Sequence, residues 1–304
     1  GELDPMADFG SKSTVSIQKS FRTSDIDEVG DERHLTLFEM LGNFSFAHSA
    51  SSGQGGYFKK EAIQYGYEFI TKEMGLTIDY VTVFEGEPGV PADEESEKIW
   101  KSLDPNITVK RFGRADNFWG PTGSEGPCGP TTEIYVNGIE VWNIVFNQYY
   151  QKADKSLEPL KTPGIDTGMG LERLAMVAQN TPTIFETDLF SPLTVLLPEE
   201  FGIRIKRIVA DHCRAMAFLI SDGVRPSNKE AGYILRRLMR RVIALGRLEG
   251  GALQVPTVLS EVVRLYKPFY PGLDEKNIIA VFEEERVKFE KTLSIGIKEL
   301  ARVD

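Results

Sequence analysis

The chain of 304 residues contains only two cysteines and three histidines. Cys128 and Cys213 are far apart and form no C-x-x-C pair, so we expect neither a disulfide framework nor a structural zinc site. No apolar run approaches the roughly 20 residues of a membrane-spanning helix, and no charged and then apolar leader opens the sequence. The absences predict a reduced, cytoplasmic protein without membrane contact.

Acidic residues outnumber basic ones by 45 to 35, and the net charge of −10 argues against bulk affinity for nucleic acid. The distribution is uneven, however. Eleven lysines and arginines between residues 204 and 247 stand against three acids, so this stretch carries +8 and the remainder −18. A basic block in an acidic protein is a candidate surface for a polyanion.

The hydrophobic pattern changes near residue 200. Before it, helical periods over 59–74 and 92–103 alternate with strand patterns over 78–86 and 132–151, the last turning at Asn137-Gly138. The small, polar stretch 48–56 predicts a flexible loop.

After residue 200 the pattern is almost entirely helical. Helices are predicted over 207–223, over 229–246 and along the tail from Glu275, which we expect to break at Gly296. The sequence therefore predicts an α+β fold, with a mixed domain over 1–200 followed by an all-helical domain over 201–304.

The stretch GIDTGMGLERLA, 164–175, joins a carboxylate to a glycine-rich helix start. Gly168 and Gly170 lack a Cβ and let the backbone approach a ligand closely. The helix start offers unpaired N–H groups, and Arg173 adds a planar charge. With Asp166 these groups suit a ligand that bears an amine and a phosphate, although a plain strand–turn–helix connection explains them equally well.

The strand pattern EVWNIVF, 140–146, places one polar residue among apolar ones. Alternation puts Asn143 and Val145 on one face and Glu140 and Trp142 on the other. Such an asparagine indicates a pocket wall with a fixed hydrogen-bonding group, and a solvent-facing asparagine is the alternative.

The segment 21–46 predicts two strands joined by a loop. Arg22 and Arg33 precede Phe38, an order that fits joint recognition of a phosphate and a base. In the alternative, the arginines face solvent and the apolar residues only build the core. Cys128, within the glycine- and proline-rich stretch 116–134, has no second ligand nearby and is predicted to be a small buried residue.

In the predicted helix 229–246, apolar residues form one stripe and arginines fill the gaps between them. The arginines are Arg236, Arg237, Arg240 and Arg241. Because acids are almost absent from this helix, we expect the four charges to repel one another unless an anion such as a nucleic-acid backbone binds. A solvated basic face is the alternative.

Together, five segments resemble the alanyl-tRNA synthetases, a family of class II aminoacyl-tRNA synthetases, in the family's order and over most of the chain. They are RHLTLFEMLGNFSF (33–46), DNFWGPTGSEGPCGPTTEI (116–134), EVWNIVFNQY (140–149), GIDTGMGLERL (164–174) and ADHCRAMAFLISDGVRPSNKEAGYILRRLMRR (210–241). The resemblance implies an antiparallel class II sheet flanked by helices. It also implies a ligase that activates alanine with ATP and Mg²⁺ and charges the 3′ end of tRNA(Ala).

The resemblance assigns roles to single residues. Arg22 holds the α-phosphate of ATP, Phe38 stacks on adenine and Arg173 covers the other adenine face. The full ATP-binding set is Arg22, Arg33, Phe38, Met40, Gly168, Gly170 and Arg173. Arg22, Asp166 and Arg173 are the expected catalytic residues, and they act by placement and charge rather than as nucleophiles.

The resemblance also implies which residues bind alanine and Mg²⁺. Asp166 pairs with the α-ammonium of alanine, and Trp119, Asn143 and Val145 close the pocket for the small side chain. Glu140 and Glu133 are the candidates for holding Mg²⁺, and no other metal ligand is expected.

The helical part resembles the family's tRNA-recognition domain, which reads a G·U pair in the acceptor stem. Asn228 matches the asparagine that contacts this pair, and the four arginines of 229–246 match the basic helix along the RNA backbone.

The sequence also departs from the family. Residues 1–14 show no clear trace of the first class II motif, Thr131 replaces a usual cysteine, and the loop from Arg22 to Glu28 lacks a usual lysine. By the resemblance, the given sequence ends partway through the recognition domain, and the family's editing and oligomerisation domains would lie beyond it. We therefore expect a monomeric catalytic fragment that does not proofread mischarging with serine or glycine.

Two alternatives stay open. Intact Asp166, Gly168, Gly170 and Arg173 favour an active alanine-activating fragment. The missing first motif keeps open a non-catalytic RNA-binding protein built on a degenerate synthetase core. A class II-like ligase that uses an adenylated amino acid without tRNA is the other alternative, and the arginine-rich helix argues against it.

Overall fold

The computed structural model describes residues 5–46, 56–121, 123–248 and 253–300. The chain forms two compact units, one of Gly1–Lys19 with Glu39–Asn180 and one of Ser20–Phe38 with Thr181–Asp304. The division falls within the strands β1 (Ser13–Phe21) and β2 (Leu37–Ser45). These units are defined by contacts within the fold and do not test the predicted functional domains over 1–200 and 201–304, which stay a prediction. The loop predicted over 48–56 lies almost wholly outside the described residues.

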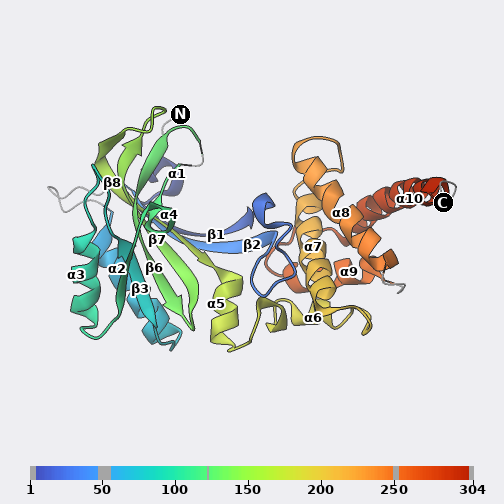
Figure 1. Ribbon diagram of the computed structural model, residues 1–304, viewed down its shortest axis with the longest axis horizontal. Helices are drawn as coiled ribbons and strands as arrows, with labels where there is room; N and C mark the ends of the chain where they lie inside the picture. Colours follow the sequence, from blue (N-terminus) through green and yellow to red (C-terminus); the bar gives the residue numbers. More distant parts are fainter. Residues whose placement is uncertain (1–4, 47–55, 122, 249–252, 301–304) are drawn as a thin grey trace. The chain divides into compact units, whose positions relative to one another are not determined.

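An eight-stranded sheet builds the first unit, in the order β1-β2-β8-β7-β6-β3-β4, with β5 paired to β6 (Figure 1). The other strands are β3 (Tyr80–Phe84), β4 (Val109–Phe112), β5 (Phe118–Trp119), β6 (Gly126–Val136), β7 (Ile139–Gln151) and β8 (Leu157–Gly170). The central strands pair antiparallel, whereas β3 and β4 pair parallel. This mostly antiparallel sheet with flanking helices confirms the predicted α+β class.

The hairpin between β6 and β7 turns at the predicted residues. Asn137 and Gly138 both have positive φ, 52° and 73°. Asparagine and glycine tolerate this backbone region, and two such residues match the twist of a two-residue hairpin. The turn thereby fixes the pairing of two strands that carry candidate site residues.

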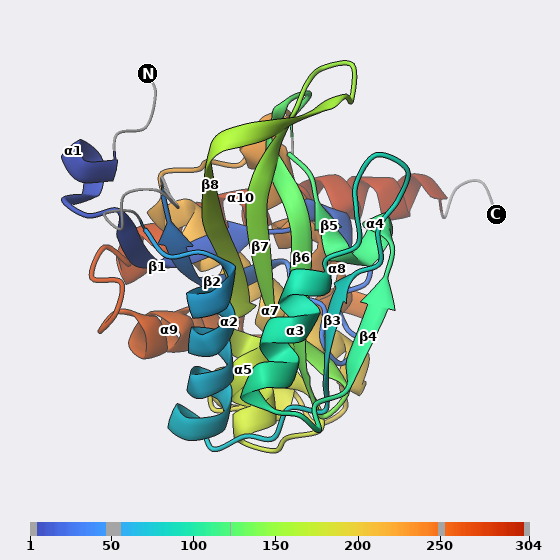
Figure 2. The same ribbon diagram turned by 90° about the vertical axis from the view of Figure 1, so that its left-hand side faces the viewer.

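Two helices cover one face of the sheet, which we call the helix face (Figure 2). They are α2 (Lys59–Glu68), continued by the π-helical turn η2 (Phe69–Glu73), and α3 (Glu94–Leu103). The ring of Phe69 packs edge-on against that of Trp142, with centroids 5.6 Å apart, and Trp100 donates from Nε1 to Thr132 Oγ1 at 2.9 Å. Trp142 and Thr132 therefore mark the helix face of β7 and β6.

The remaining helices of the first unit are short: α1 (Pro5–Phe9), α4 (Arg114–Asn117) and α5 (Leu171–Ala178). Near α4, Cys128 is fully buried in a cluster with Phe84, Val90 and Phe118. Burial raises the pKa of its thiol, as expected of the small core residue that the sequence predicts.

The second unit is helical except for the strand ends. It contains the turns η1 (Thr23–Asp25) and η3 (Ile184–Glu186) and the helices α6 (Ser191–Thr194), α7 (Ile203–Ser221), α8 (Glu230–Leu248), α9 (Val255–Tyr266) and α10 (Glu275–Leu300). The predicted helices over 207–223 and 229–246 are confirmed as α7 and α8. The expected break at Gly296 is wrong, because one glycine costs a helix only about 1 kcal/mol and the long helix continues through it.

No helix in the described ranges is both long enough and apolar enough to cross a membrane.

Gly129 on β6 lies against the backbone of β7, and this contact gives a test of the sheet. A Cβ at this position would stand 1.8 Å from the carbonyl oxygen of Phe146. Gly129→Ala therefore forces the strands apart, and we expect the free energy of unfolding in urea to fall by about 3 kcal/mol or more. Gly120→Ala is the control, because its nearest atom, Gln151 Oε1, lies 3.9 Å away. Equal stability of the two variants would contradict the close approach.

Candidate functional site

The register of β6, β7 and β8 gathers the predicted polar residues on one face of the sheet. Asn143 on β7 lies opposite Glu133 on β6 and Gly168 on β8, and Val145 lies opposite Asp166. Cross-strand partners project to the same side, so these residues share the face opposite the helix face. We call it the site face, and it confirms the predicted common face of Asn143 and Val145.

A bulge brings Glu140 to the site face as well. The β6–β7 register shifts between Ile134 and Tyr135, so that Tyr135 pairs with Glu140. Tyr135 donates from its hydroxyl to Glu133 Oε2 at 3.0 Å, which places its partner Glu140 on the same side. Alternation predicted Glu140 on the face of Trp142, and this is wrong because one extra residue reverses the alternation.

Asp166 is a carboxylate on the site face without a protein partner. Within the described residues no hydrogen bond or ion pair engages it, although it is half-buried, and burial raises its pKa. Its diagonal neighbour Asn143 has a buried Oδ1 that also lacks a hydrogen-bond partner. Diagonal cross-strand neighbours lie about 7 Å apart. Two unsatisfied acceptors at this spacing suit the N–H groups of a small ammonium compound.

Four of the residues predicted for ATP cluster at the end of β8. Met40 on β2 pairs with Gly170, and its Sδ would lie 3.0 Å from a Cβ at Gly168. Arg173, in the first turn of α5, donates from Nη1 to the carbonyl and the carboxylate of Glu140 at 3.2 and 3.0 Å. Because Gly168 and Gly170 lack a Cβ, the side chains of Met40 and Arg173 lie close to the backbone at the end of β8.

The other three residues predicted for ATP belong to the second unit. Arg22 occupies the N-cap position of η1 without a side-chain capping hydrogen bond. Its side chain is 55% exposed, and its Nε lies 3.4 Å from Asp25 Oδ2. Arg33 is exposed, and Phe38, the second residue of β2, is half-buried. Their role in binding ATP stays a prediction.

Trp119 lies on β5, which pairs with β6 at Gly129. The strand β6 therefore separates it from Asn143 and Val145 on β7, and Trp119 is 37% exposed. Val145 itself is buried. The contribution of Trp119 to an alanine pocket stays a prediction.

Glu133 lies at the centre of a buried network that the sequence analysis did not recognise. It is 6% exposed, and its Oε2 accepts from Thr82 Oγ1 at 3.1 Å and from the Tyr135 hydroxyl at 3.0 Å. Its Oε1 accepts from Asn143 Nδ2 at 3.3 Å. Burial raises the pKa of Glu133 to about 7. The signal was present in β6, where polar residues occupy every second position from Thr131 to Tyr135.

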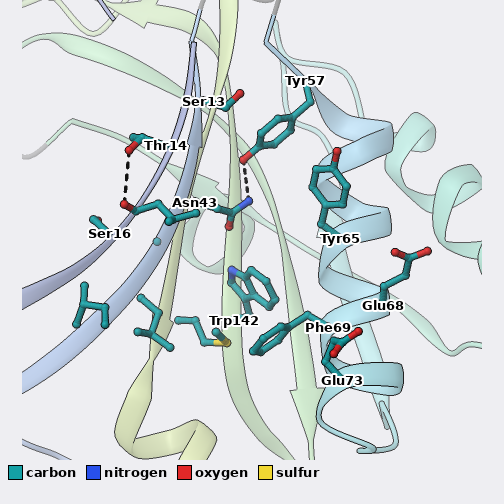
Figure 3. Close-up of a pocket in the computed structure, with 15 residues that line it drawn as sticks. Ser13, Thr14, Ser16, Asn43, Tyr57, Tyr65, Glu68, Phe69, Glu73 and Trp142 are labelled. Carbon is teal, nitrogen blue, oxygen red and sulfur yellow. Dashed lines mark hydrogen bonds between the residues drawn. The ribbon is translucent and has the colours of Figure 1, made fainter. Parts of the chain in front are cut away.

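A separate hollow of about 970 Å³ lies on the helix face (Figure 3). Tyr65 and Phe69 face Trp142 and the strands β1 and β2 across it, and Asn43 donates to the Tyr57 hydroxyl at 2.8 Å. Apart from its rim it is mostly apolar, and no predicted site residue lines it. It is therefore distinct from the cluster around Asp166, on the opposite side of the same strands.

Two arginines of α8 have acidic partners from other parts of the second unit. Arg237 donates from Nη2 to both carboxylate oxygens of Asp27 at 2.7 and 2.9 Å, and Arg240 donates from Nε to Glu285 at 2.7 Å. The expectation that only a bound anion relieves the repulsion within α8 is therefore wrong. Acids distant in sequence do so, and a count along one helix misses them.

The other two arginines differ from each other. Arg241 is half-buried and donates from Nη1 to the Ile26 carbonyl at 2.6 Å. Arg236 makes no hydrogen bond or ion pair within the part of the chain that the structure describes, and Asn228 is exposed just before α8. Arg236 and Asn228 are thus the members of the predicted RNA-binding set that remain available to an outside ligand.

The sequence of this chain is similar to those of known tRNA synthetases. The sequence model of the family described as tRNA synthetases class II (A) matches residues 7–138 and 137–303. The alanine–tRNA ligase of Rubrobacter xylanophilus is 41% identical over 317 residues, which cover 90% of this chain and 35% of the relative. That of Myxococcus xanthus is 42% identical over 327 residues, covering 94% and 35%.

The alanine–tRNA ligase of Borrelia hermsii is 38% identical over 340 residues, which cover 100% of this chain and 55% of the relative. The chain thus spans between about a third and about half of the length of these relatives. The family match extends over nearly all of its residues. With its mostly antiparallel sheet and its match to the family model, this chain belongs to the family described as tRNA synthetases class II (A).

Proposed function

We propose that this chain carries the aminoacylation activity of an alanine–tRNA ligase. It would activate alanine with ATP to alanyl-adenylate and then charge the 3′ end of tRNA(Ala). Family membership and the similar alanine–tRNA ligases support the reaction class. One observation carries the proposal: among the residues that the structure describes, neither the Asp166 carboxylate nor the Oδ1 of its diagonal neighbour Asn143 has a partner on the site face.

In this proposal the site face binds alanine by its ammonium group. The Asp166 carboxylate and Asn143 Oδ1 accept its N–H groups, and the charge pair offsets the cost of burying Asp166. Buried Val145, opposite Asp166, presents an apolar surface that suits a methyl group. Trp119 is proposed to close this pocket on the strength of the sequence resemblance.

ATP is proposed to bind where Met40, Gly168, Gly170 and Arg173 cluster. Arg22, Arg33 and Phe38 are added from the sequence resemblance, with Arg22 at the α-phosphate. The alanine carboxylate attacks the α-phosphorus and the bond to pyrophosphate breaks. A hydroxyl of the terminal ribose of tRNA then attacks the alanyl carbonyl and releases AMP. Fixed positive charge lowers both barriers by stabilising the oxygens that gain charge.

Family membership also implies Mg²⁺, which would neutralise phosphate charge. Mg²⁺ usually binds one or two carboxylates together with substrate phosphates. Glu140 fits this chemistry, because its side chain is 34% exposed and, within the described ranges, its one ion pair is with Arg173. Glu133 fits poorly, because both of its oxygens already accept hydrogen bonds from buried protein groups.

For RNA, we propose that Asn228 and Arg236 contact the acceptor stem of tRNA(Ala). Arg237, Arg240 and Arg241 would contribute positive potential while bonded to their protein partners. A monomeric state and a cytoplasmic location are proposed from the sequence.

Asp166→Asn tests the amine site. Because it removes the charge that faces the ammonium group, we expect kcat/KM for alanine in ATP–pyrophosphate exchange to fall at least about 100-fold. Asp154→Asn, in an exposed turn where Asp154 accepts from Ser156, is the matched control. Serine and glycine serve as comparison substrates. Activity of Asp166→Asn within threefold of wild type would place the ammonium elsewhere. A folded wild-type protein without exchange would favour the RNA-binding alternative.

Glu133 gives a prediction for pH dependence. Burial raises the pKa of Glu133 to about 7 in the folded protein, from an ordinary value of 4.5. Between pH 4.5 and pH 7 the folded state therefore binds more protons than the unfolded state. The free energy of unfolding should therefore fall as pH rises. Relative to Glu133→Gln, which cannot titrate, we expect wild type to lose about 2–3 kcal/mol between pH 5 and pH 8 in urea unfolding. Parallel pH profiles would contradict the buried, protonated carboxyl.

Arg236→Gln tests the RNA contact without disturbing an internal bond. We expect weaker binding of an acceptor-stem hairpin of tRNA(Ala), and a slope of log affinity against log salt that is shallower by about 1. Fluorescence anisotropy over a salt series measures both. Lys98→Gln, which changes an exposed lysine of α3, is the control for net charge. An unchanged slope in Arg236→Gln would show that this arginine does not meet a phosphate.

A further inference from the structure

The segment between β1 and β2 is held by α7 and α8 along most of its length. Its apolar residues Ile26 and Val29 are fully buried. Four arginines of the two helices donate to it: Arg204 to the Asp27 carbonyl, Arg207 to the Asp31 carbonyl, Arg237 to the Asp27 carboxylate and Arg241 to the Ile26 carbonyl. Arg214 donates to the carbonyl of Leu37, the first residue of β2. Part of the basic block between 204 and 247 therefore binds the protein itself.

Asp211 of α7 links these contacts to the backbone of Arg22. It is fully buried, and its Oδ1 accepts from the Thr36 amide at 2.8 Å. The Thr36 carbonyl in turn accepts from the Arg22 amide at 2.9 Å. A single buried carboxylate thus fixes the residue that pairs with the backbone of Arg22.

The second carboxylate oxygen of Asp211 is linked to the same segment indirectly, through His212 and Arg241. Its Oδ2 lies 2.8 Å from His212 Nδ1, so the carboxylate accepts from an Nδ1–H and leaves Nε2 as an acceptor. That Nε2 faces Arg241 Nη1 at 3.4 Å. Arg241 holds the Ile26 carbonyl at 2.6 Å. Asp211 therefore controls the tautomer on which the Ile26 anchor depends.

Arg22 itself has little side-chain support. Its side chain is 55% exposed and its Nε lies 3.4 Å from Asp25 Oδ2, so the direction of the side chain depends mainly on the backbone from which it projects. A group that must meet a phosphate needs a fixed position, since displacement by about 1 Å can cost a reaction roughly 100-fold.

We propose that Asp211 is a positioning residue for ATP. Through Thr36 on one side, and through His212 and Arg241 on the other, it fixes the loop that carries Arg22. This inference rests on the proposed function, in which Arg22 binds the α-phosphate. It makes α7 and α8 part of the apparatus for amino-acid activation, a step that precedes any contact with RNA.

Asp211→Asn separates positioning from bulk stability. The amide oxygen still accepts from Thr36, but the amide nitrogen is a donor and forces His212 Nδ1 to accept. The histidine proton then moves to Nε2 and faces the Arg241 guanidinium, donor against donor. The Ile26 anchor loosens while the volume of the buried site stays the same.

The test is alanine-dependent ATP–pyrophosphate exchange with ATP and alanine varied separately. For Asp211→Asn we expect kcat/KM for ATP to fall roughly 10- to 100-fold, with KM for alanine within twofold of wild type. Glu261→Gln, which breaks an exposed pair with Arg264 on α9, is the control for loss of a carboxylate. Unchanged ATP kinetics, or equal effects on ATP and alanine, would overturn the proposal.

Hydrogen exchange of the backbone gives a readout that needs no activity. We expect faster exchange in a peptide covering residues 20–38 of Asp211→Asn, with unchanged exchange in the sheet. If Asp211→Asn does not fold, Arg241→Lys carries the same test, because it weakens the Ile26 anchor and leaves Thr36 bound. If the wild-type protein shows no alanine-dependent ATP–pyrophosphate exchange, the proposed function is contradicted. If hydrogen exchange over residues 20–38 is the same in Asp211→Asn as in wild type, the positioning role of Asp211 is contradicted.

Discussion

The antiparallel register of β6, β7 and β8 is the constraint on which the proposed site depends. It places Asp166, Asn143 and Gly168 on one face and leaves Trp142 and Met169 on the other. Side chains alternate along a strand, so a slip of one residue would exchange the two faces completely. The hairpin turn at Asn137-Gly138 and the apolar residues packed under α2 hold the register in place. The chemistry of the site therefore depends on the packing of the opposite face.

Charge is arranged differently in the two units. The site face leaves Asp166 unsatisfied within the described chain, and it keeps Glu133 buried among donors with a raised pKa. In the second unit, by contrast, several arginines of α7 and α8 are bonded to carbonyls and a carboxylate of the segment before β2. An unpaired buried charge is costly and marks a place where a ligand adds stability, whereas a paired charge mainly fixes structure.

Periodic features were predictable from the sequence, and features that depend on distant partners were not. The helices α7 and α8 and the β6–β7 turn follow from local patterns. The face of Glu140 depended on a bulge that alternation cannot reveal, and the partners of Arg237 and Arg240 come from distant segments. The glycine-rich stretch 164–175 already pointed to Asp166, and the family resemblance assigned it the ammonium group of alanine. The structure adds that its carboxylate lacks a partner within the described residues. Asp211 and His212 are adjacent in sequence, but the contacts that link them to the segment before β2, through Thr36 and Arg241, are visible only in the structure.

The central claim is that Asp166 receives the ammonium group of alanine, and a carboxyl titration by NMR tests it most directly. Labelled aspartate would report the pKa of Asp166 in the free protein, with saturating alanine, and with lactate, which lacks the amine. Burial should hold the pKa above its ordinary value in the free protein, and alanine should lower it while lactate should not. An Asp166 pKa that stays the same when alanine binds would contradict the account.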